Sequence, residues 1–271
     1  MKVRARSVSI LLLCGMVCLP AWAVQTIQEP QPTPAQEQLN FGVQAFKAGQ
    51  FEAAVVHFRK ATELDPELQN AHLYLATALA QQYVPGVEGP ENVKFAQDAI
   101  GEYAEVLKLD ANSINAIKGT GWLYMNLREF DKARDYYRKA LAVNTQDPEL
   151  YYSVGFIDWS QAYRERASVL SALGQRIDYS LIKRPACAKL RAANLSRVTD
   201  GIQMLKQALA LRADYDSAMA YLNLLYREQA AIECGDPKAE AADVKTANEW
   251  VERAMAARKK KAEQQVPEIQ K

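Results

Sequence analysis

The sequence predicts an all-α protein, a solenoid of about five helix pairs with elongated second, fourth and fifth units. The first observation is that residues 39–66 have the pattern of two short amphipathic helices joined by a turn at Gly49. Ala54, Phe58 and Ala61 share one face of the second helix. The second observation is that this pattern recurs, once at a spacing of 34 residues. Recurrence at such a spacing is expected of helix pairs that stack on one another.

A common register places the small residue of each first helix at the same position. Gly42, Gly121 and Gly155 occupy it, Ala76 fits it less well, and Asn223 departs from it. The triplets equivalent to Ala54, Phe58 and Ala61 are Ala99, Tyr103 and Val106; Ala133, Tyr137 and Ala140; and Ala247, Val251 and Ala254. The units therefore span about 35–68, 69–113, 114–147, 148–215 and 216–258.

This order of small residues, turn glycine, aromatic ring and terminal proline resembles the tetratricopeptide repeat (TPR). The resemblance covers about 35–258 and implies a right-handed solenoid. No unit is a full match, and the family's tryptophan at the fourth position is absent throughout. The segments Tyr83–Asn92 and Ala218–Glu228 also resemble uncharacterised exported TPR proteins of Gram-negative bacteria, which gives no function by itself.

The N-terminus, residues 1–23, has the pattern of a secretory signal peptide. Lys2, Arg4 and Arg6 precede a short apolar run, and a small-x-small cleavage site ends at Ala23. The run is too short to span a bilayer comfortably, although an uncleaved anchor stays an alternative. We therefore expect an exported protein, periplasmic or else secreted, with no stable membrane insertion after cleavage.

The rest of the chain divides into a Pro-rich linker (24–36), the solenoid (37–258) and a basic and polar tail (259–271). Removal of the signal peptide changes the formal net charge from +1 to −2. Such a nearly neutral chain has no basic excess with which to bind nucleic acid. Nucleic acid is therefore not an expected partner.

Few residues could carry chemistry. The two histidines, His57 and His72, have no cysteine or paired carboxylates nearby in the sequence to complete a metal site. No Gly-rich phosphate loop and no nucleophile elbow is present. The sequence therefore predicts no metal, no cofactor and no enzymatic activity. An enzyme with a site in the fourth-unit insertion is a remote alternative.

Recognition by a surface is the favoured hypothesis. In the TPR family the first helices line a concave groove, and the matching positions in this chain are rich in aromatic residues. The predicted protein- or peptide-binding groove contains Lys118, Trp122, Met125 and Asn126 of the third unit and Tyr152, Phe156 and Trp159 of the fourth. Trp and Tyr are strong anchors for an apolar peptide or helix. The alternative is that the long fourth-unit helices bury these rings as core.

One recognition mode of the family can be weighed from its residues. TPR adaptors of heat-shock chaperones bind a terminal carboxylate through Lys, Arg and Asn at set positions. The matching positions here are Leu39, Val43, Tyr74, Asn115 and Gly119, which carry no charge. We therefore predict an exported scaffold for an apolar protein or peptide. The alternative function is a self-associating assembly component of the cell envelope.

Two cysteines, Cys187 and Cys234, remain after signal cleavage. Disulfides persist in an exported compartment, so a Cys187–Cys234 bond is one interpretation and two free, partly buried thiols are the other. If the helices that precede these residues are straight, counting residues along them leaves the two cysteines roughly 9 Å apart along the helix axis. The bond therefore requires the connection between the helices to bend.

Overall fold

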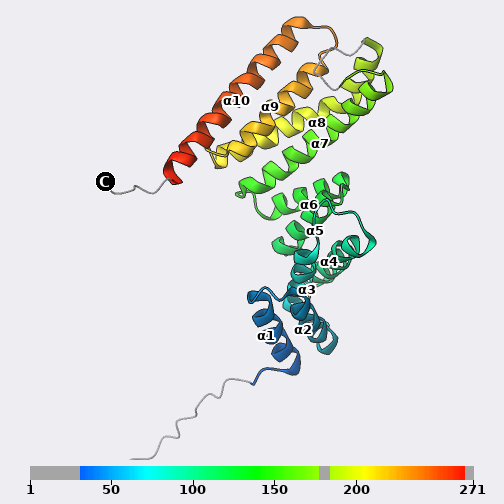
Figure 1. Ribbon diagram of the computed structural model, residues 1–271, viewed down its shortest axis with the longest axis vertical. Coiled ribbons are helices and arrows are strands. Elements are labelled where there is room, and N and C mark those ends of the chain that lie inside the picture. Colours follow the sequence, from blue (N-terminus) through cyan, green and yellow to red (C-terminus); the bar gives the residue numbers. More distant parts are fainter. Residues whose placement is uncertain (1–30, 177–183, 266–271) are drawn as a thin grey trace, which may run out of the picture. The chain divides into compact units, whose positions relative to one another are not determined.

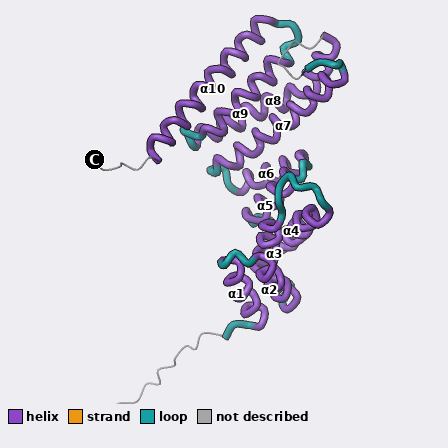
Figure 2. Tube along the Cα trace, viewed as in Figure 1, coloured by secondary structure: helices purple, strands orange, loops and turns teal. Residues whose placement is uncertain are grey.

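A computed structural model describes residues 31–176 and 184–265 (Figure 1), which form ten helices and no strand (Figure 2). The helices are α1 (Pro34–Lys47), α2 (Phe51–Leu64), α3 (Gln69–Gln82), α4 (Pro90–Leu109), α5 (Ile114–Asn126), α6 (Phe130–Val143), α7 (Pro148–Ala172), α8 (Arg184–Leu211), α9 (Asp216–Ala231) and α10 (Pro237–Gln265). The predicted signal peptide and residues 24–30 of the predicted linker lie outside the described residues. Among the residues that are described, no helix is both long and apolar enough to cross a membrane.

The helices pack in consecutive pairs, as predicted. α1 packs along α2, α3 along α4, α5 along α6, α7 along α8 and α9 along α10. Each pair contacts the next through its second helix, in the contacts α2–α3, α4–α5, α6–α7 and α8–α9. Pairwise stacking of this kind defines an α-solenoid, so the predicted fold class is confirmed.

The predicted small and aromatic positions hold the regular pairs together. Ala54, Phe58 and Ala61 are each 0% exposed. A Cβ atom added at Gly42 would lie 2.4 Å from the ring of Phe58. Only a glycine therefore lets α1 approach this ring, which explains the small residue in the register.

The long helices α7 and α8 cross at two glycines. A Cβ atom at Gly155 would lie 2.6 Å from Cγ of Leu205 and 3.2 Å from the carbonyl oxygen of Gly201. A Cβ atom at Gly201 would lie 2.9 Å from Cβ of Asp158. The close crossing places Asp158, which is 0% exposed, between the two helices.

Two boundaries differ from the prediction. α1 begins at Pro34, inside the predicted linker 24–36, because Thr33 and Gln36 form a capping box and Pro is favourable in the first turn. α10 continues to Gln265, inside the predicted tail 259–271. Ion pairs join Asp216 of α9 to Arg258 (2.9 Å) and to Lys261 (2.7 Å). Asp216 therefore anchors the end of α10.

The second unit is elongated by a loop and by a longer second helix. The loop 83–89 follows α3, and the Asn92 side chain holds it. Asn92 accepts a hydrogen bond from the Val84 N–H (2.8 Å) and donates to the Val84 and Val87 carbonyl oxygens (2.9 Å each). α4 then runs for 20 residues, whereas α2 and α6 have 14. The extra residues of α4 therefore lie at its N-terminal end, outside the repeat register.

Candidate protein-binding surface

Aromatic side chains of α7 and α9 gather into one cluster, which we call the aromatic platform. It consists of Tyr152, Phe156, Trp159 and Tyr163 of α7, Tyr221 of α9 and Tyr215, which immediately precedes α9. The Tyr221 ring lies 5.0 Å from that of Phe156 and 5.1 Å from that of Trp159, measured between centroids. Edge-to-face geometry at both contacts is favourable for aromatic pairs.

The three platform residues predicted from the sequence are half-buried. Tyr152 and Trp159 pack against the core shared by α7, α8 and α9, and Phe156 packs against the core shared by α5, α6 and α7. The rings are therefore supported from beneath and retain exposed surface. This arrangement lies between the groove and the core interpretations that the sequence left open.

Trp122 lies apart from the platform in its ring contacts. It is 37% exposed and meets Tyr83 edge-to-face, with 6.1 Å between ring centroids. Asn126 donates a hydrogen bond to the Trp122 carbonyl oxygen (2.8 Å), and Met125 is half-buried against the neighbouring core. Of the predicted groove residues, Trp122 is therefore the most exposed large apolar side chain in the described chain.

A buried ion pair fixes α7 against α9 beside the platform. Arg166 binds Glu228 through two hydrogen bonds, of 2.7 and 3.0 Å, and each side chain is 2% exposed. Burial raises the pKa of Glu228, and Arg166 opposes that rise. The Arg166 guanidinium also lies 5.5 Å from the centroid of the Tyr163 ring. Because a two-bond pair of this kind holds one geometry, it restricts the relative position of the two helices.

Charged groups near the platform are paired within the chain. Lys118 binds Asp147 at 2.7 Å, and Arg212 binds Glu149 at 2.7 Å. Burial raises the pKa of Asp147, but hydrogen bonds from Lys118 and the Glu149 N–H, with nearby positive charge, lower it overall. The hydroxyl of Tyr215 donates to Glu149, and burial raises the pKa of Tyr215. The platform therefore consists of uncharged rings, and the charged side chains beside it are paired with one another.

The cysteines lie in a disulfide. Cys187 of α8 is bonded to Cys234, with 5.5 Å between their Cα atoms. α9 ends at Ala231, and Cys234 has a positive φ of 55° in the following turn. The chain therefore bends where the bond requires it.

The histidines have partners other than a metal site. His57 bonds the Gln38 side chain at 2.9 Å, and His72 lies 2.7 Å from a Glu102 carboxylate oxygen and 3.0 Å from the Pro66 carbonyl oxygen. Across the described ranges, no group of three potential metal ligands gathers.

Sequence reasoning missed several residues of this surface. Tyr163, Tyr215 and Tyr221 are not among the predicted groove residues. Glu228 is also outside that prediction, and the structure buries it against Arg166, 62 residues away in the sequence.

Two segments of the chain match family models. Residues 44–82 match the TPR repeat model and residues 115–147 match the tetratricopeptide repeat model. The chain therefore contains tetratricopeptide repeats in these two segments. The second match falls on the third predicted unit, 114–147, so the register deduced there is that of the family.

Solved structures share the fold of this TPR protein at low sequence identity. A crystal structure of MamA is 17% identical, with a TM-score of 0.56, over 82% of this chain and 96% of that one. A second MamA structure is 16% identical, with a TM-score of 0.59, over 87% of this chain and 98% of that one. MamA from Desulfovibrio magneticus RS-1 is 16% identical, with a TM-score of 0.56, over 83% and 96%. These similarities concern the fold alone.

A curated relative covers a shorter part of the TPR protein. The photosystem I assembly protein Ycf3 of Prochlorococcus marinus is 31% identical over 107 residues, or 38% of this chain. The chain spans 59% of the length of that relative.

Proposed function

We propose that this TPR protein is a scaffold that acts by binding rather than catalysis, and that it holds an apolar peptide or helix of a partner protein. Its site is the groove formed by the aromatic platform together with Trp122. The observation that carries the proposal is a set of half-exposed rings on α7 and α9, held by a buried ion pair. Rigid aromatic side chains lose little conformational entropy on binding, so they anchor a partner well.

The charges beside the platform favour an apolar partner segment. Lys118 and Arg212 each pair with a carboxylate of the chain, so neither is left over for a partner's terminal carboxylate. Binding should therefore depend on buried apolar area and change little with salt.

Export is part of the same proposal, with the periplasm as the first expectation. Its support is the signal-peptide pattern of residues 1–23 and the Cys187–Cys234 disulfide, because structural disulfides persist in oxidising compartments. Fractionation of cells expressing the full chain, with mass analysis of the mature N-terminus, tests this part. A product that starts after Ala23 in the periplasmic fraction is the expected result, and an uncleaved cytoplasmic product contradicts it.

The test of binding compares substitutions inside and outside the groove. Mature protein is used to capture partners from an envelope extract, and the captured partner is then purified and its affinity measured. Trp122→Ala and Trp159→Ala should each weaken binding about tenfold or more, since buried aromatic anchors contribute at least about 1.4 kcal/mol. Met255→Ala on α10, where the side chain is 65% exposed, is the matched control and should bind normally. Equal affinities for all variants would exclude the groove.

A second candidate function, self-association, has one observation in its favour. Five residues share the seventh register position: Leu75, Thr120, Val154 and Leu222, which are at most 1% exposed, and Phe41, which is 49% exposed. In the described residues no helix pair precedes the first unit, and this position is exposed there. A second copy could cover Phe41 there. Sedimentation equilibrium of the mature chain and of the Phe41→Ser variant tests this. A dimer that forms with the unchanged chain and not with the variant supports self-association, and a strict monomer excludes it.

A further inference from the structure

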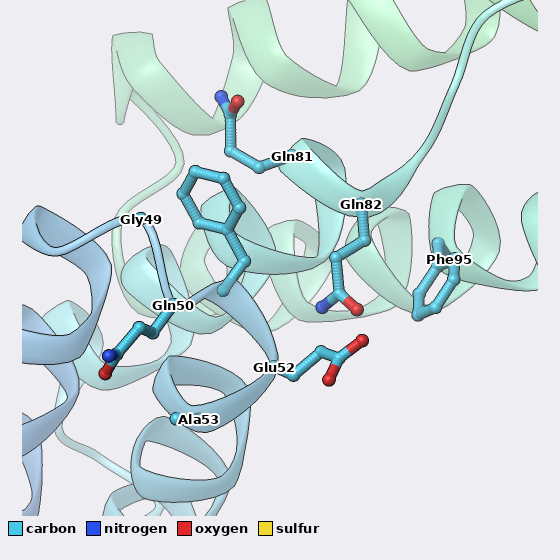
Figure 3. Close-up of a pocket in the computed structure, with 8 residues that line it drawn as sticks. Gly49, Gln50, Glu52, Ala53, Gln81, Gln82 and Phe95 are labelled. Atoms are coloured by element: carbon cyan, nitrogen blue, oxygen red, sulfur yellow. The ribbon is translucent and has the colours of Figure 1, made fainter.

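The elongated second unit forms a crevice between α2 and α4. A hollow of about 620 Å³ lies between the start of α2, the end of α3 and the α4 extension (Figure 3). A second hollow of about 340 Å³ between α2 and α4 adjoins it. The two share Glu52, Gln82 and Phe95, so they form one crevice. Its size is within the range of sites that hold small ligands or short peptide segments.

The crevice has an apolar floor. Val55 of α2, Leu79 of α3 and Phe95 of α4 line it, and Phe51 borders its wider end. Figure 3 places Glu52, Gln82 and Phe95 around one space, with the Glu52 carboxylate and the Gln82 amide directed toward it. An apolar side chain entering here would meet the Phe95 ring and have polar groups within reach at the edge.

Phe95 is unusual for its place in the repeat. It stands four residues before Ala99, and the residues at the same distance before Ala54 and Ala133 are Gln50 and Glu129. In those units the position is a polar turn residue. In the second unit it is a half-buried ring within the six-residue extension of α4. The ring packs against the core shared by α2 to α5 and also lines the crevice, so part of its surface is accessible to a ligand.

The rim of the crevice carries an excess of negative charge. Lys94 and Asp98 pair with each other at 2.6 Å. Of the remaining charged lining residues, Glu52 and Glu91 are acidic and Arg59 is basic, and in the described chain neither glutamate forms an ion pair. A bound segment that supplies a cation would therefore be favoured over one that supplies an anion.

We infer that this crevice is a second docking site, distinct from the aromatic groove. Its occupant is a segment of a partner protein that places one large apolar side chain on Phe95 and an adjacent Lys or Arg beside Glu52 and Glu91. The hydrogen bonds of the Asn92 side chain to the loop 83–89 hold the start of α4 in place, so the site is formed before the partner binds.

The test uses two synthetic peptides and the isotope-labelled mature protein. One probe is acetyl-Ala-Ala-Phe-Lys-Ala-Ala-amide, and the other replaces Lys by Glu. Amide shifts in nuclear magnetic resonance spectra report where each peptide binds. The Lys peptide should give saturable shifts at Glu52, Gln82 and Phe95, and the Glu peptide should bind several-fold more weakly.

Variants separate the two parts of the site. Phe95→Ala should weaken the Lys peptide about tenfold or more, because the apolar contact is lost. The double variant Glu52→Gln with Glu91→Gln changes only exposed side chains, so it should fold normally and remove the preference for Lys over Glu. Met255→Ala is the control and should bind both peptides as the unchanged protein does.

Several outcomes would overturn the inference. These are no saturable shift in the crevice, equal binding of the two peptides, an unchanged preference in the double glutamine variant, or shifts confined to the Trp122 and Trp159 region. Failure here leaves the groove proposal intact, because Trp122→Ala and Trp159→Ala test that surface and do not touch the crevice.

Discussion

The first three helix pairs and the last two are stabilised by different means. In the first three, short helices meet through small residues and one ring per unit, as with Gly42 and Phe58, and these contacts follow the repeat. In the last two, α7 and α8 have 25 and 28 residues, and non-repeating links join them to α9 and to the turn that follows it. Those links are the Arg166–Glu228 pair, the aromatic platform and the disulfide.

The difference indicates what a longer helix needs in a repeat array. The part of a long helix that extends past a shorter neighbouring unit makes no contact with that unit. The sequence therefore has to supply additional links along the extra turns. In this chain those links also position the aromatic rings, so stability and binding depend on the same residues.

We expect the largest loss of stability when one residue of the buried ion pair is removed. Arg166→Ala leaves the Glu228 carboxylate buried without its main partner, and the free energy of unfolding should fall by about 3–5 kcal/mol. Urea denaturation measures this. Replacing both residues by Leu should cost much less, since no buried charge remains.

A matched exposed pair serves as the control for that prediction. Lys118→Ala removes a partner from a pair whose side chains are 39% and 18% exposed, and the loss should be at most about 1 kcal/mol. Equal losses for Arg166→Ala and Lys118→Ala would contradict the role given to burial.

The disulfide offers the second largest effect. It links residues 47 apart in the sequence, and replacing both Cys187 and Cys234 by Ser should reduce stability by about 2–4 kcal/mol. Hydrogen exchange should show faster opening of α8–α10 and unchanged protection of α1–α6, because each unit contacts only its neighbours. Uniform loss of protection along the chain would show that the two regions do not open separately.

Asp158 predicts a dependence of stability on pH in the second region. Burial raises its pKa to about 6, and Arg134, whose Nε lies 2.8 Å away, opposes the rise. A raised carboxyl pKa means that the folded chain favours the protonated form, so this group's contribution to stability falls as pH rises through about 6. Between pH 5 and pH 8 the free energy of unfolding should fall by about 1–2 kcal/mol from this group.

Asp158→Asn tests that assignment. The neutral amide should remove this part of the pH dependence, and urea denaturation at pH 5 and pH 8 measures it for both proteins. The nearby charged residues Arg138 of α6 and Asp200 of α8 are unchanged in the variant, so both proteins keep their contribution to the pH dependence. An undiminished pH dependence in the variant would assign the effect to another group.

The last prediction tests the regular region. Gly42→Ala brings a Cβ atom to 2.4 Å from the Phe58 ring, and thermal denaturation should show a loss of about 1–3 kcal/mol. At Gly121 the added Cβ would lie 3.4 Å from its nearest neighbours, which is ordinary contact. Gly121→Ala should therefore be neutral or slightly stabilising, and equal losses at both sites would refute the close-approach explanation.

The sequence predicted the repeat well because repeat packing is local. Gly42, Ala54, Phe58 and Ala61 recur at fixed spacing, and their burial follows from helix geometry. Phe156 and Trp159 were placed on the correct helix for the same reason. The sequence could not rank them as exposed or buried, since that depends on where Tyr221 lies.

The features that were missed depend on residues far apart in the chain. Glu228 is buried where Arg166 meets it from another helix, and α10 continues beyond its predicted end, where Lys261 pairs with Asp216 of α9. No spacing rule predicts such contacts. The crevice also required the structure, since its walls come from three helices of two units.

Photo-crosslinking tests the central claim most directly, because it locates the partner on the surface of the protein. A benzophenone amino acid is placed at Trp122, at Trp159 and, as the control, at Met255, and cells are irradiated before the crosslinked products are identified by mass spectrometry. The account predicts one partner crosslinked from positions 122 and 159 through an apolar segment, and none from 255. Crosslinks from 255 alone, or equal crosslinks from all three positions, would contradict it.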